Sequence, residues 1–354
     1  MYFAILDNPC PDQKNLSSGG LRCSLALLIY VMSFISLRKV GKAGDTVWRR
    51  LPPTVREGSP GRLVGSCIHA LSRKFSSRGQ SDSTWFLRNE PLLSTVLEII
   101  SGSFASGASV RICSMACSSG AELYSLLWLI RKARPDLDVV ALGVDISEAA
   151  LERARFACYF RDDMEFRGSI YEEAFRGLFE TDGPVFRVKD AIRRGVRWVQ
   201  GDARDTALPS KFGSCDVVLA NNFLIHMEPG DASAALMNVA RLVRPGGILV
   251  CRGIDLNVRQ KVANRLRLKP LPIRLEQIHN AELDLDARRH WPWKYYGLEP
   301  LNRNRKDFVQ RYTAVFQVTG QAWNPTRVHW ANPDHPPRLT ARWHRAAYGW
   351  GEKS

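Results

Sequence analysis

The chain has 354 residues, 45% hydrophobic residues, 10% aromatic residues and a net charge of +15. This length and composition exclude a disordered chain and suffice for one large or two ordinary domains. The eight cysteines include no C-x-x-C pair, which argues against a structural zinc site and a disulfide scaffold and favours reduced thiols in the cytoplasm. The positive charge accompanies no reader motif for nucleic acid, so we expect general attraction of anions rather than specific nucleic-acid binding.

The first 45 residues are interpreted as an extension that contains one uncharged apolar segment, Cys23–Leu37. A transmembrane helix needs about 20 residues, so this segment is short for a membrane span. Four interpretations stay open: a membrane anchor, a cleaved signal, a buried helix, and a spurious extension of a chain that starts at Met32. The short length disfavours membrane contact.

Residues 46–109 are predicted to form a helical lead. The stretch RLVGSCIHALSRKF repeats apolar residues at helical spacing, with Leu63, Cys67, Ile68 and Leu71 on one face. The stretch STWFLRNEPLLSTVLEII begins with polar residues and continues into a second apolar helical pattern. A link rich in Gly and Ser, SGSFASGAS, separates this helix from the next domain.

Residues 110–318 alternate strand-like and helix-like segments. Strands are expected at SVRICS, DVVALGV, VRWVQG, CDVVLA and GILVCRG, and helices between them include AELYSLLWLIRKA, SEAALERARFACY and GDASAALMNVARLV. This alternation predicts an α/β fold with a doubly wound, mostly parallel sheet and helices on both faces. RPGG at 244–247 should separate the fourth core helix from the fifth strand, and RYTAVFQV should close the sheet. Residues 319–354 are predicted to be an irregular tail.

In such a sheet, ligands bind at the carboxyl ends of the strands. The segments expected there are SMACSSGAE after the first strand, Asp145 after the second, Asp202 after the third, and ANN at 220–222 after the fourth. The first turn offers one glycine, Gly120, whereas a pyrophosphate needs several backbone N–H groups brought close by glycines. Glu122, Asp145 and Asp202 instead suit a cationic ligand with ribose hydroxyls. These features point to S-adenosylmethionine as the cofactor.

Five blocks, in the same order, resemble those of the CheR-type methyltransferases. In this chain the five blocks are TWFLR, CSSGAELYS, GVDIS, CDVVLANNFLIHM and LVRPGGILV. The corresponding family motifs, in the same order, are T-x-F-F-R, C-S-x-G-E-E-x-Y-S, D-I, F-D-x-I-x-C-R-N-x-L-I-Y-F and L-x-P-G-G. The resemblance covers about residues 82–255 and the closing strand. It implies an S-adenosylmethionine-dependent methyltransferase with a Rossmann-like sheet. Members of this family methylate glutamate side chains of chemotaxis receptors.

The resemblance also implies which residues form the site. Arg88 would lie beside both the cofactor and the reacting group, and Gly120 is expected to let the backbone approach the ligand. The implied cofactor contacts are Thr84 and Arg88 at the methionine end, Glu122 at the ammonium, Asp145 at the ribose, Asp202 and Ala203 at the adenine side, and Asn222 from the fourth strand.

Three residues depart from the resembled blocks. Ala121 stands for the first Glu of G-E-E, Asn221 for the Arg of C-R-N, and His226 for the Tyr of L-I-Y-F. The family's receptor-docking helical domain is not recognisable before Thr84. In place of its small β-subdomain, PVFRVKDAIRRGVRWV at 184–199 suits a reduced hairpin. The cofactor half is therefore kept and the acceptor half altered.

This division leads to a hypothesis about the acceptor. A carboxylate needs no base, whereas a hydroxyl or an amine needs one within hydrogen-bond reach. We assign His226 as that base and Arg88 as the orienting cation. The alternative is that His226 replaces the Tyr as a wall residue. A protein carboxylate and a small molecule stay open as acceptors.

Two other classes of function compete with methyl transfer. One is a non-catalytic module that binds the cofactor as a regulatory ligand, with Ala121, Asn221 and His226 as signs of decay. The other is a nucleic-acid binder, which predicts strong salt dependence and no cofactor affinity.

Two further clusters contain residues that could carry chemistry. Glu276, His279 and Glu282 share a helical spacing, but we predict no metal site there because metal ligands usually gather in larger sets. The aromatic cluster HWPWKYYGLEPL at 290–301 suits either an acceptor pocket or simple packing.

Overall fold

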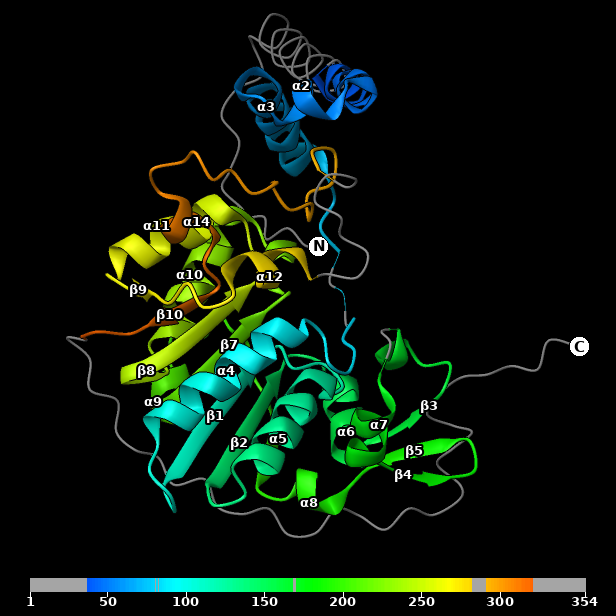
Figure 1. Cartoon of the computed structure of the whole chain (residues 1–354), viewed down its shortest axis with the longest axis vertical. Coiled ribbons are helices and arrows are strands. Elements are labelled where there is room, and N and C mark those ends of the chain that lie inside the picture. The colour runs from blue at the N-terminus through cyan, green and yellow to red at the C-terminus, as the bar shows by residue number, and fades with distance from the viewer. Residues whose placement is uncertain (1–36, 80, 82, 168–169, 282–290, 321–354) are drawn as a thin grey trace, which may run out of the picture. The chain divides into compact units, whose positions relative to one another are not determined.

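A computed structural model describes residues 37–79, 81, 83–167, 170–281 and 291–320 (Figure 1). The apolar segment Cys23–Leu37, apart from its last residue, lies outside these residues, as do the alternative start at Met32 and the tail from residue 321. Within the described ranges, no helix is both long enough and apolar enough to traverse a bilayer.

The chain divides into two compact units. Among the described residues, the first unit comprises 37–76 and 291–299, and the second comprises those within 77–281 and 300–320. The block TWFLR and the helix after it belong to the second unit, together with the sheet. The prediction from the sequence instead places TWFLR and this helix in a helical lead over residues 46–109. The boundary at Ser76 therefore falls earlier than the predicted start of the sheet domain.

The first unit is helical. Its described helices span residues 37–50, α2 Pro53–Glu57 and α3 Ser59–Phe75. Trp48, Ile68 and Trp291 form a small core, where the two indole rings meet edge to face with centroids 5.3 Å apart. A Cβ on Gly65 would lie 2.2 Å from the Trp291 ring, so this contact requires glycine. Within the aromatic cluster, Trp291 thus serves packing.

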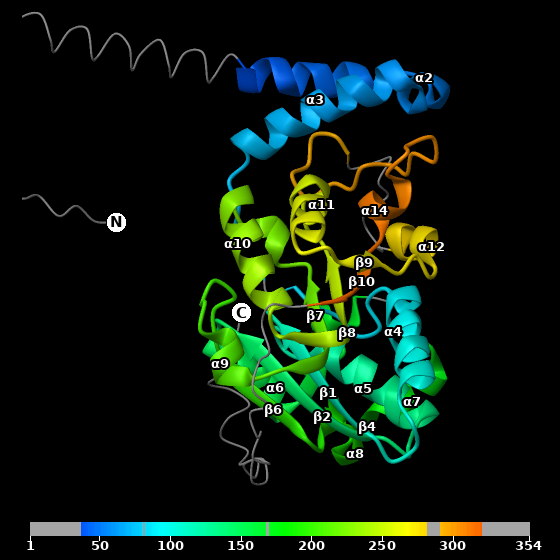
Figure 2. The ribbon, with the colours of Figure 1, turned by 90° about the vertical axis from the view of Figure 1, so that its left-hand side faces the viewer.

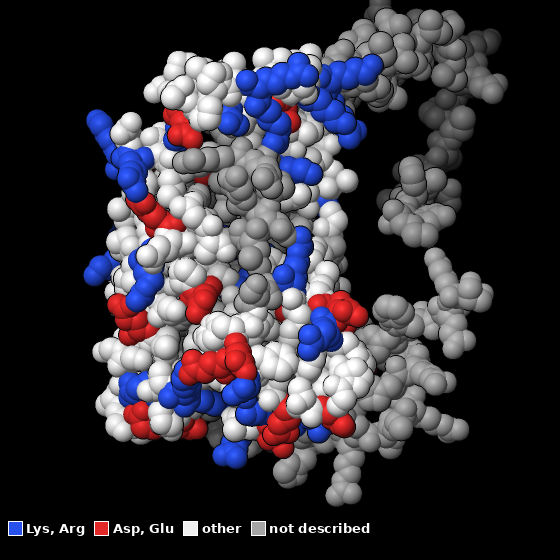
Figure 3. All heavy atoms as spheres, turned by 45° about the vertical axis from the view of Figure 1, so that its right-hand side comes forward, with Lys and Arg blue, Asp and Glu red and all other residues white. Residues whose placement is uncertain are grey.

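Basic residues dominate the surface of this helical unit. Residues 37–76 contain nine Lys or Arg and two Asp or Glu, and Figure 3 shows the Lys and Arg side chains gathered over these helices. The same helices expose Val40, Val47, Leu63 and Val64. The surface of the helical unit is therefore basic and partly apolar, which suits an anionic partner.

The second unit is built on a seven-stranded sheet with the order β6-β2-β1-β7-β8-β10-β9. Strands β6, β2, β1, β7 and β8 run parallel, and β10 is antiparallel to both β8 and β9. The strands are β1 Ser109–Met115, β2 Asp138–Asp145, β6 Val196–Gln200, β7 Cys215–Asn221, β8 Val243–Arg252, β9 Lys269–Pro270 and β10 Val315–Gln317. The predicted mostly parallel sheet is confirmed.

Helices cover both faces of this sheet, as predicted (Figure 2). Side chains along β1 alternate between two cores, because successive strand residues point to opposite faces. Val110 and Ile112 pack with α4 and α5, whereas Cys113 and Met115 pack with α9, α10 and α11. The helices of this unit are α4 Glu90–Ser103, α5 Ala121–Ala133, α6 Glu148–Phe156, α7 Glu172–Leu178, α8 Asp190–Arg193, α9 Leu208–Phe212, α10 Pro229–Ala240, α11 Leu256–Arg265, α12 Leu275–Asn280 and α14 Phe308–Tyr312, with short 3₁₀ turns η1 Met164–Phe166 and η2 Leu224–His226.

A second, antiparallel sheet follows α6, with the order β3-β5-β4. Its strands are β3 Cys158–Phe160, β4 Phe179–Asp182 and β5 Val185–Val188. The sequence predicts a hairpin within 184–199, and that position is wrong. The hairpin turns at Gly183, whose φ of +56° favours glycine, and residues 196–199 belong to the main sheet as part of β6.

Two predicted boundaries are also wrong. RPGG at 244–247 does not precede the fifth strand but lies within β8, which pairs with β7 through a register shift. Gly246 in this stretch has a φ of +79°, so the glycine serves an irregular strand start rather than a helix end. The closing strand is shorter than RYTAVFQV, because Arg311 and Tyr312 lie in α14.

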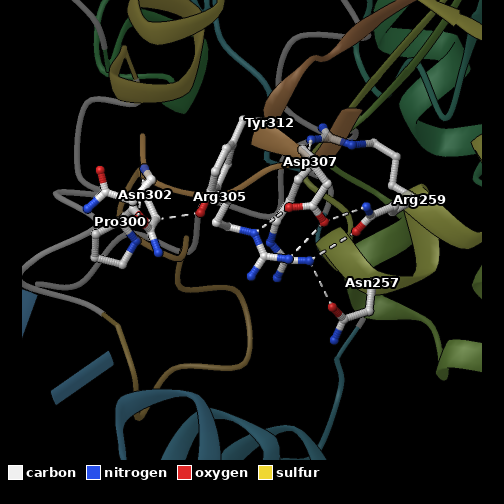
Figure 4. Close-up of polar contacts among 10 residues, drawn as sticks. Asn257, Arg259, Pro300, Asn302, Arg305, Asp307 and Tyr312 are labelled. Atoms are coloured by element: carbon white, nitrogen blue, oxygen red, sulfur yellow. Dashed lines mark hydrogen bonds and ion pairs between the residues drawn. The ribbon is translucent and has the colours of Figure 1, made fainter. Parts of the chain in front are cut away.

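Polar contacts fix residues 305–312, the last described segment before β10, to α11 (Figure 4). Arg305 donates two hydrogen bonds to the Asp307 carboxylate, at 2.7 and 2.8 Å. Arg259 donates to the backbone carbonyls of Cys251 and Arg311, at 3.0 and 2.7 Å. Arg259 thereby ties β8 to α14.

Trp198 on β6 restricts its neighbour on β2. It pairs in register with Gly143, and a Cβ at position 143 would lie 2.2 Å from the indole ring. We therefore expect Gly143→Ala to lower the free energy of unfolding by about 1–3 kcal/mol, the usual cost of overpacking, as measured by denaturant titration. Gly102→Ala in α4 is the control, because nothing lies within 4 Å of its added Cβ. Equal losses in both variants would contradict this account.

Candidate active site

A cavity of about 280 Å³ lies at the carboxyl ends of the parallel strands in the second unit. Its wall comes from the segment before α4, the turn after β1, and the residues that end or follow β2, β6 and β7. The structure brings most of the predicted site residues into this wall: Thr84, Arg88, Glu122, Asp145, Asp202, Ala203, Asn222 and His226. Gly120 does not line it.

Gly120 has a structural reason to be glycine. It is the N-cap of α5 with a φ of +85°. A Cβ there would lie 2.6 Å from the Trp198 ring and 3.2 Å from Ala154. Conformation and packing against Trp198 therefore require glycine, without any approach of a ligand to the backbone.

The turn before Gly120 is held by Asp145. Two of its non-glycine residues adopt left-handed backbone, Ala116 with φ +52° and Ser118 with φ +51°. Asp145 Oδ2 accepts the N–H of Ser118 at 2.7 Å, and Oδ1 accepts the N–H of Ser147 at 2.9 Å. Because an ionised carboxylate has about four lone-pair sites, Asp145 keeps acceptor capacity for two ligand hydroxyls.

Glu122 lies in the first turn of α5 and lines the cavity. Burial raises the pKa of its carboxyl above 4.5, while a hydrogen bond from Asn221 and the charges of Arg88 and Arg252 oppose that rise. Asn221 Nδ2 donates to Glu122 Oε1 at 2.9 Å. An ammonium group in the cavity would favour the ionised form of Glu122 further, so the carboxylate suits a cationic ligand.

Arg88 reaches the same cavity from the block TWFLR. Its guanidinium stacks on Trp85, 3.9 Å from the ring centroid. Burial lowers the pKa of Arg88 to about 10, with Glu122 acting in the opposite direction, so the side chain stays protonated at neutral pH. Leu87 and Asn89 on either side have φ values of +54° and +55°, so the backbone turns sharply around Arg88.

His226 lies in η2, just after β7. Burial, Arg88 and Arg78 lower its pKa below 6.5, so the imidazole is neutral at pH 7. Arg78 also lines the cavity, donates to the carbonyl of Met227 and has its Nε 3.4 Å from Glu228 Oε1. The cavity wall therefore contains three guanidinium groups, those of Arg78, Arg88 and Arg204, and one neutral imidazole.

Asp202 and Asn222 are each constrained by a neighbour. Arg204 donates to both oxygens of Asp202, with a shortest distance of 2.6 Å, and lowers the pKa of that carboxyl. The Asp202 carboxylate is thus paired within the chain. Asn222 has a φ of +63°, and a Cβ on Gly253 would lie 2.5 Å from its Cα, so β7 and β8 approach closely where they end.

The donor set of this cavity fits the predicted cofactor. Glu122 offers a carboxylate for an ammonium, and Asp145 offers free acceptor capacity for ribose hydroxyls. A pyrophosphate would meet the negative charge of both groups. The residues present therefore suit S-adenosylmethionine better than a dinucleotide.

Three arginines near the cavity were not found by sequence reasoning. Arg78 and Arg204 line the cavity, and Arg252 acts on Glu122 by its charge. Arg78 lies in SSRGQSDS, which reads as a plain loop. Arg252 ends an apolar strand, β8, whose pairing with β7 cannot be read from the sequence. A search for arginines at strand ends would have found Arg252.

The other candidate cluster does not assemble. Glu276 pairs with Arg303 at 2.9 Å, His279 packs on Tyr312 with ring centroids 5.3 Å apart, and Glu282 lies outside the described residues. In the part of the chain that the structure describes, no three His, Cys, Asp or Glu side chains gather to hold a metal ion.

Asp145 allows a test of how the turn is held. We expect Asp145→Asn to lower the free energy of unfolding by about 1.5–3 kcal/mol, because one charge-assisted bond to a backbone N–H is lost. The measurement is denaturant titration without ligand at neutral pH. Asp138→Asn, at the exposed start of the same strand, is the matched control and should change stability little. Equal effects at both positions would refute the role of Asp145.

The sequence matches the family described as CheR methyltransferase, SAM binding domain, over residues 82–261. The probable biofilm formation methyltransferase WspC of Pseudomonas aeruginosa is 28% identical over 216 residues, which cover 58% of this chain and 46% of WspC. Chemotaxis protein methyltransferase 2 of Vibrio cholerae is 27% identical, covering 48% of this chain and 60% of the relative. A chemotaxis protein methyltransferase of Vibrio parahaemolyticus is 29% identical, covering 48% and 62%.

These comparisons bear on the predictions in two ways. The chain spans about half to three fifths of the length of these curated relatives. The matched family region exceeds half of the chain and contains every predicted site residue, and its description confirms S-adenosylmethionine as the cofactor. The chain therefore belongs to the CheR methyltransferase family, through its S-adenosylmethionine-binding domain.

Proposed function

We propose that the chain is an S-adenosylmethionine-dependent methyltransferase whose acceptor is a carboxylate on a protein. The observation that carries this proposal is the composition of the cavity wall. Glu122 and Asp145 provide carboxylates that suit a cationic cofactor, and Arg88 and Arg78 provide guanidinium groups that suit an anionic acceptor. The names of the relatives, a probable biofilm formation methyltransferase and chemotaxis protein methyltransferases, support the reaction type.

Within this proposal each predicted residue that lines the cavity has a role. When bound, S-adenosylmethionine supplies an electrophilic methyl group. Glu122 holds its ammonium, Asp145 its ribose hydroxyls and Asn222 the cofactor from the end of β7. The remaining predicted contacts come from Thr84 at the methionine end and from Asp202 and Ala203 at the adenine side.

Arg88 and Arg78 orient the acceptor in this proposal. A carboxylate is nucleophilic without losing a proton, so the chain needs no general base. The contribution of the protein is then mainly positioning, which well-oriented groups make worth about 7–11 kcal/mol. His226, neutral at pH 7, would form part of the wall.

A second candidate is methyl transfer to a hydroxyl or an amine, on a protein or a small molecule. The observation that favours it is the lowered pKa of His226, which makes the imidazole neutral at pH 7, the form in which histidine acts as a base. In this case His226 is the general base, and Arg88 orients the acceptor.

The proposed partner is a protein with an acidic surface, in the cytoplasm. The basic surface of the helical unit supports an anionic partner, since nine Lys or Arg and two Asp or Glu occur in residues 37–76. Steering of this kind weakens as salt rises.

Calorimetric titration with S-adenosylmethionine and its demethylated product tests the first step. We expect binding by the wild type and a loss of about 10- to 150-fold for Glu122→Gln, since a charge-assisted hydrogen bond contributes about 1.5–3 kcal/mol. Asp138→Asn serves again as the control with unchanged affinity. Absence of binding by the folded wild type would overturn the proposed function.

The chemistry of the product separates the two acceptors. Proteins labelled with tritiated S-adenosylmethionine are treated with alkali, which releases methanol from methyl esters but not from methyl ethers or amines. Alkali-labile label supports the carboxylate acceptor, and alkali-stable label supports the second candidate.

The pH dependence of His226→Ala provides an independent measurement. For a carboxylate acceptor, the variant should keep the shape of the wild-type pH profile. For a hydroxyl or an amine, it should lose about 10²–10⁴-fold in rate. The wild-type rate would then rise with pH through the lowered pKa of His226, which lies below 6.5, and be flat above it.

A further inference from the structure

Arg252 is a buried arginine in the second unit that the proposed function leaves without a role. It ends β8 and is 5% exposed. It does not line the cavity, whereas Glu122 does. Arg252 can therefore influence a ligand only from a distance, by its charge or through a residue that lines the cavity.

The register of the sheet brings Arg252 next to the residue that holds Glu122. Arg252 pairs with Asn221 across β7 and β8. Asn221 Oδ1 accepts the backbone N–H of Arg252 at 3.1 Å, and Asn221 Nδ2 donates to Glu122 Oε1 at 2.9 Å. One side chain thus connects the end of β8 to the carboxylate.

The backbone holds this arrangement firmly. The N–H of Asn222 donates to the carbonyl of Arg252 at 2.8 Å. A Cβ on Gly253 would lie 2.5 Å from Asn222 Cα, so the two strand ends approach as closely as glycine allows. Arg252 therefore has a fixed position relative to Asn221.

Charge links Arg252 and Glu122 directly. Each favours the ionised form of the other: Arg252 lowers the pKa of Glu122, and Glu122 raises the pKa of Arg252. Burial, Arg88 and Arg259 lower the pKa of Arg252 to about 9, so it remains a cation at neutral pH. The other groups that act on Glu122 are Arg88, from the segment before α4, and the amide of Asn221; the Cys117 thiol in the turn after β1 is itself influenced by Glu122.

The neighbouring arginine is used for another purpose. Arg259 donates to the carbonyls of Cys251 and Arg311, within the network that fixes the last described segment (Figure 4). The influence on Glu122 from the β8 side therefore comes from Arg252.

We propose that Arg252 is a positioning residue, which keeps the Glu122 carboxylate ionised and held for the cofactor ammonium. The resembled motif has an arginine where this chain has Asn221. In this chain Arg252, which pairs with Asn221 across β7 and β8, supplies the positive charge instead. This inference rests on the proposed role of Glu122 in cofactor binding.

The test compares affinity for the demethylated cofactor by calorimetry from mildly acidic to mildly alkaline pH. The wild type should bind more weakly as pH falls through the raised pKa of Glu122. Removing a nearby positive charge raises that pKa, so in Arg252→Met the weakening should begin about one pH unit higher, with about tenfold weaker binding there. Arg252→Lys keeps the charge and should restore the wild-type profile.

A double variant separates positioning from general damage. In the Glu122→Gln background, Arg252→Met should have no further effect on the pH profile. Stability provides a second measurement without ligand: Arg252→Met leaves Glu122 with one cationic neighbour fewer, so adding Glu122→Gln should recover part of any lost unfolding free energy.

The outcomes distinguish the two proposals. A wild-type profile in Arg252→Met, or an equal loss with and without Glu122, overturns the role of Arg252. If the folded wild type does not bind the demethylated cofactor, the proposed function fails. In that event the stability cycle alone still decides whether Arg252 and Glu122 are coupled.

Discussion

The partial burial of the Glu122 carboxylate, at the wall of the cavity, is the constraint on which the arrangement of the site depends. Taking a charged carboxylate out of water is costly unless charges and hydrogen bonds compensate for the lost solvent. Here the compensation comes from Arg88 before α4, Asn221 on β7 and Arg252 on β8. Three segments that are far apart along the chain thus compensate one half-buried carboxyl on α5. This compensation links the helix, the strand ends and the block TWFLR.

The sequence predicts those parts of the fold and site that depend on local residue patterns, or on the rule that ligands bind at the carboxyl ends of parallel strands. β2 and α5 follow from their apolar spacing, and Glu122, Asp145 and Asp202 meet because parallel strands end at one edge. The errors arose where tertiary context decides. The residues RPGG suit the end of a helix as well as the irregular start of a strand. Only the pairing of β8 with β7 shows that they start a strand here. Arg252 depends on strand register, which one sequence does not reveal.

The three departures from the resembled motifs have structural explanations. Ala121 is fully buried in an apolar core, where a second carboxylate would lose its solvation. Asn221 bonds both to Glu122 and to the backbone of Arg252, and His226 lines the cavity beside arginines. Each residue is thus accommodated by its surroundings.

The cavity wall combines residues from Arg78 to Met227, carried by segments that are far apart along the chain. Such a wall exists only where the long-range pairing of β1, β2, β6 and β7 is in place. A ligand that binds this wall binds the native state and not the unfolded chain. By mass action, saturation of the cavity then stabilises the entire second unit against unfolding and proteolysis, so the cellular level of the cofactor would influence how long the protein survives.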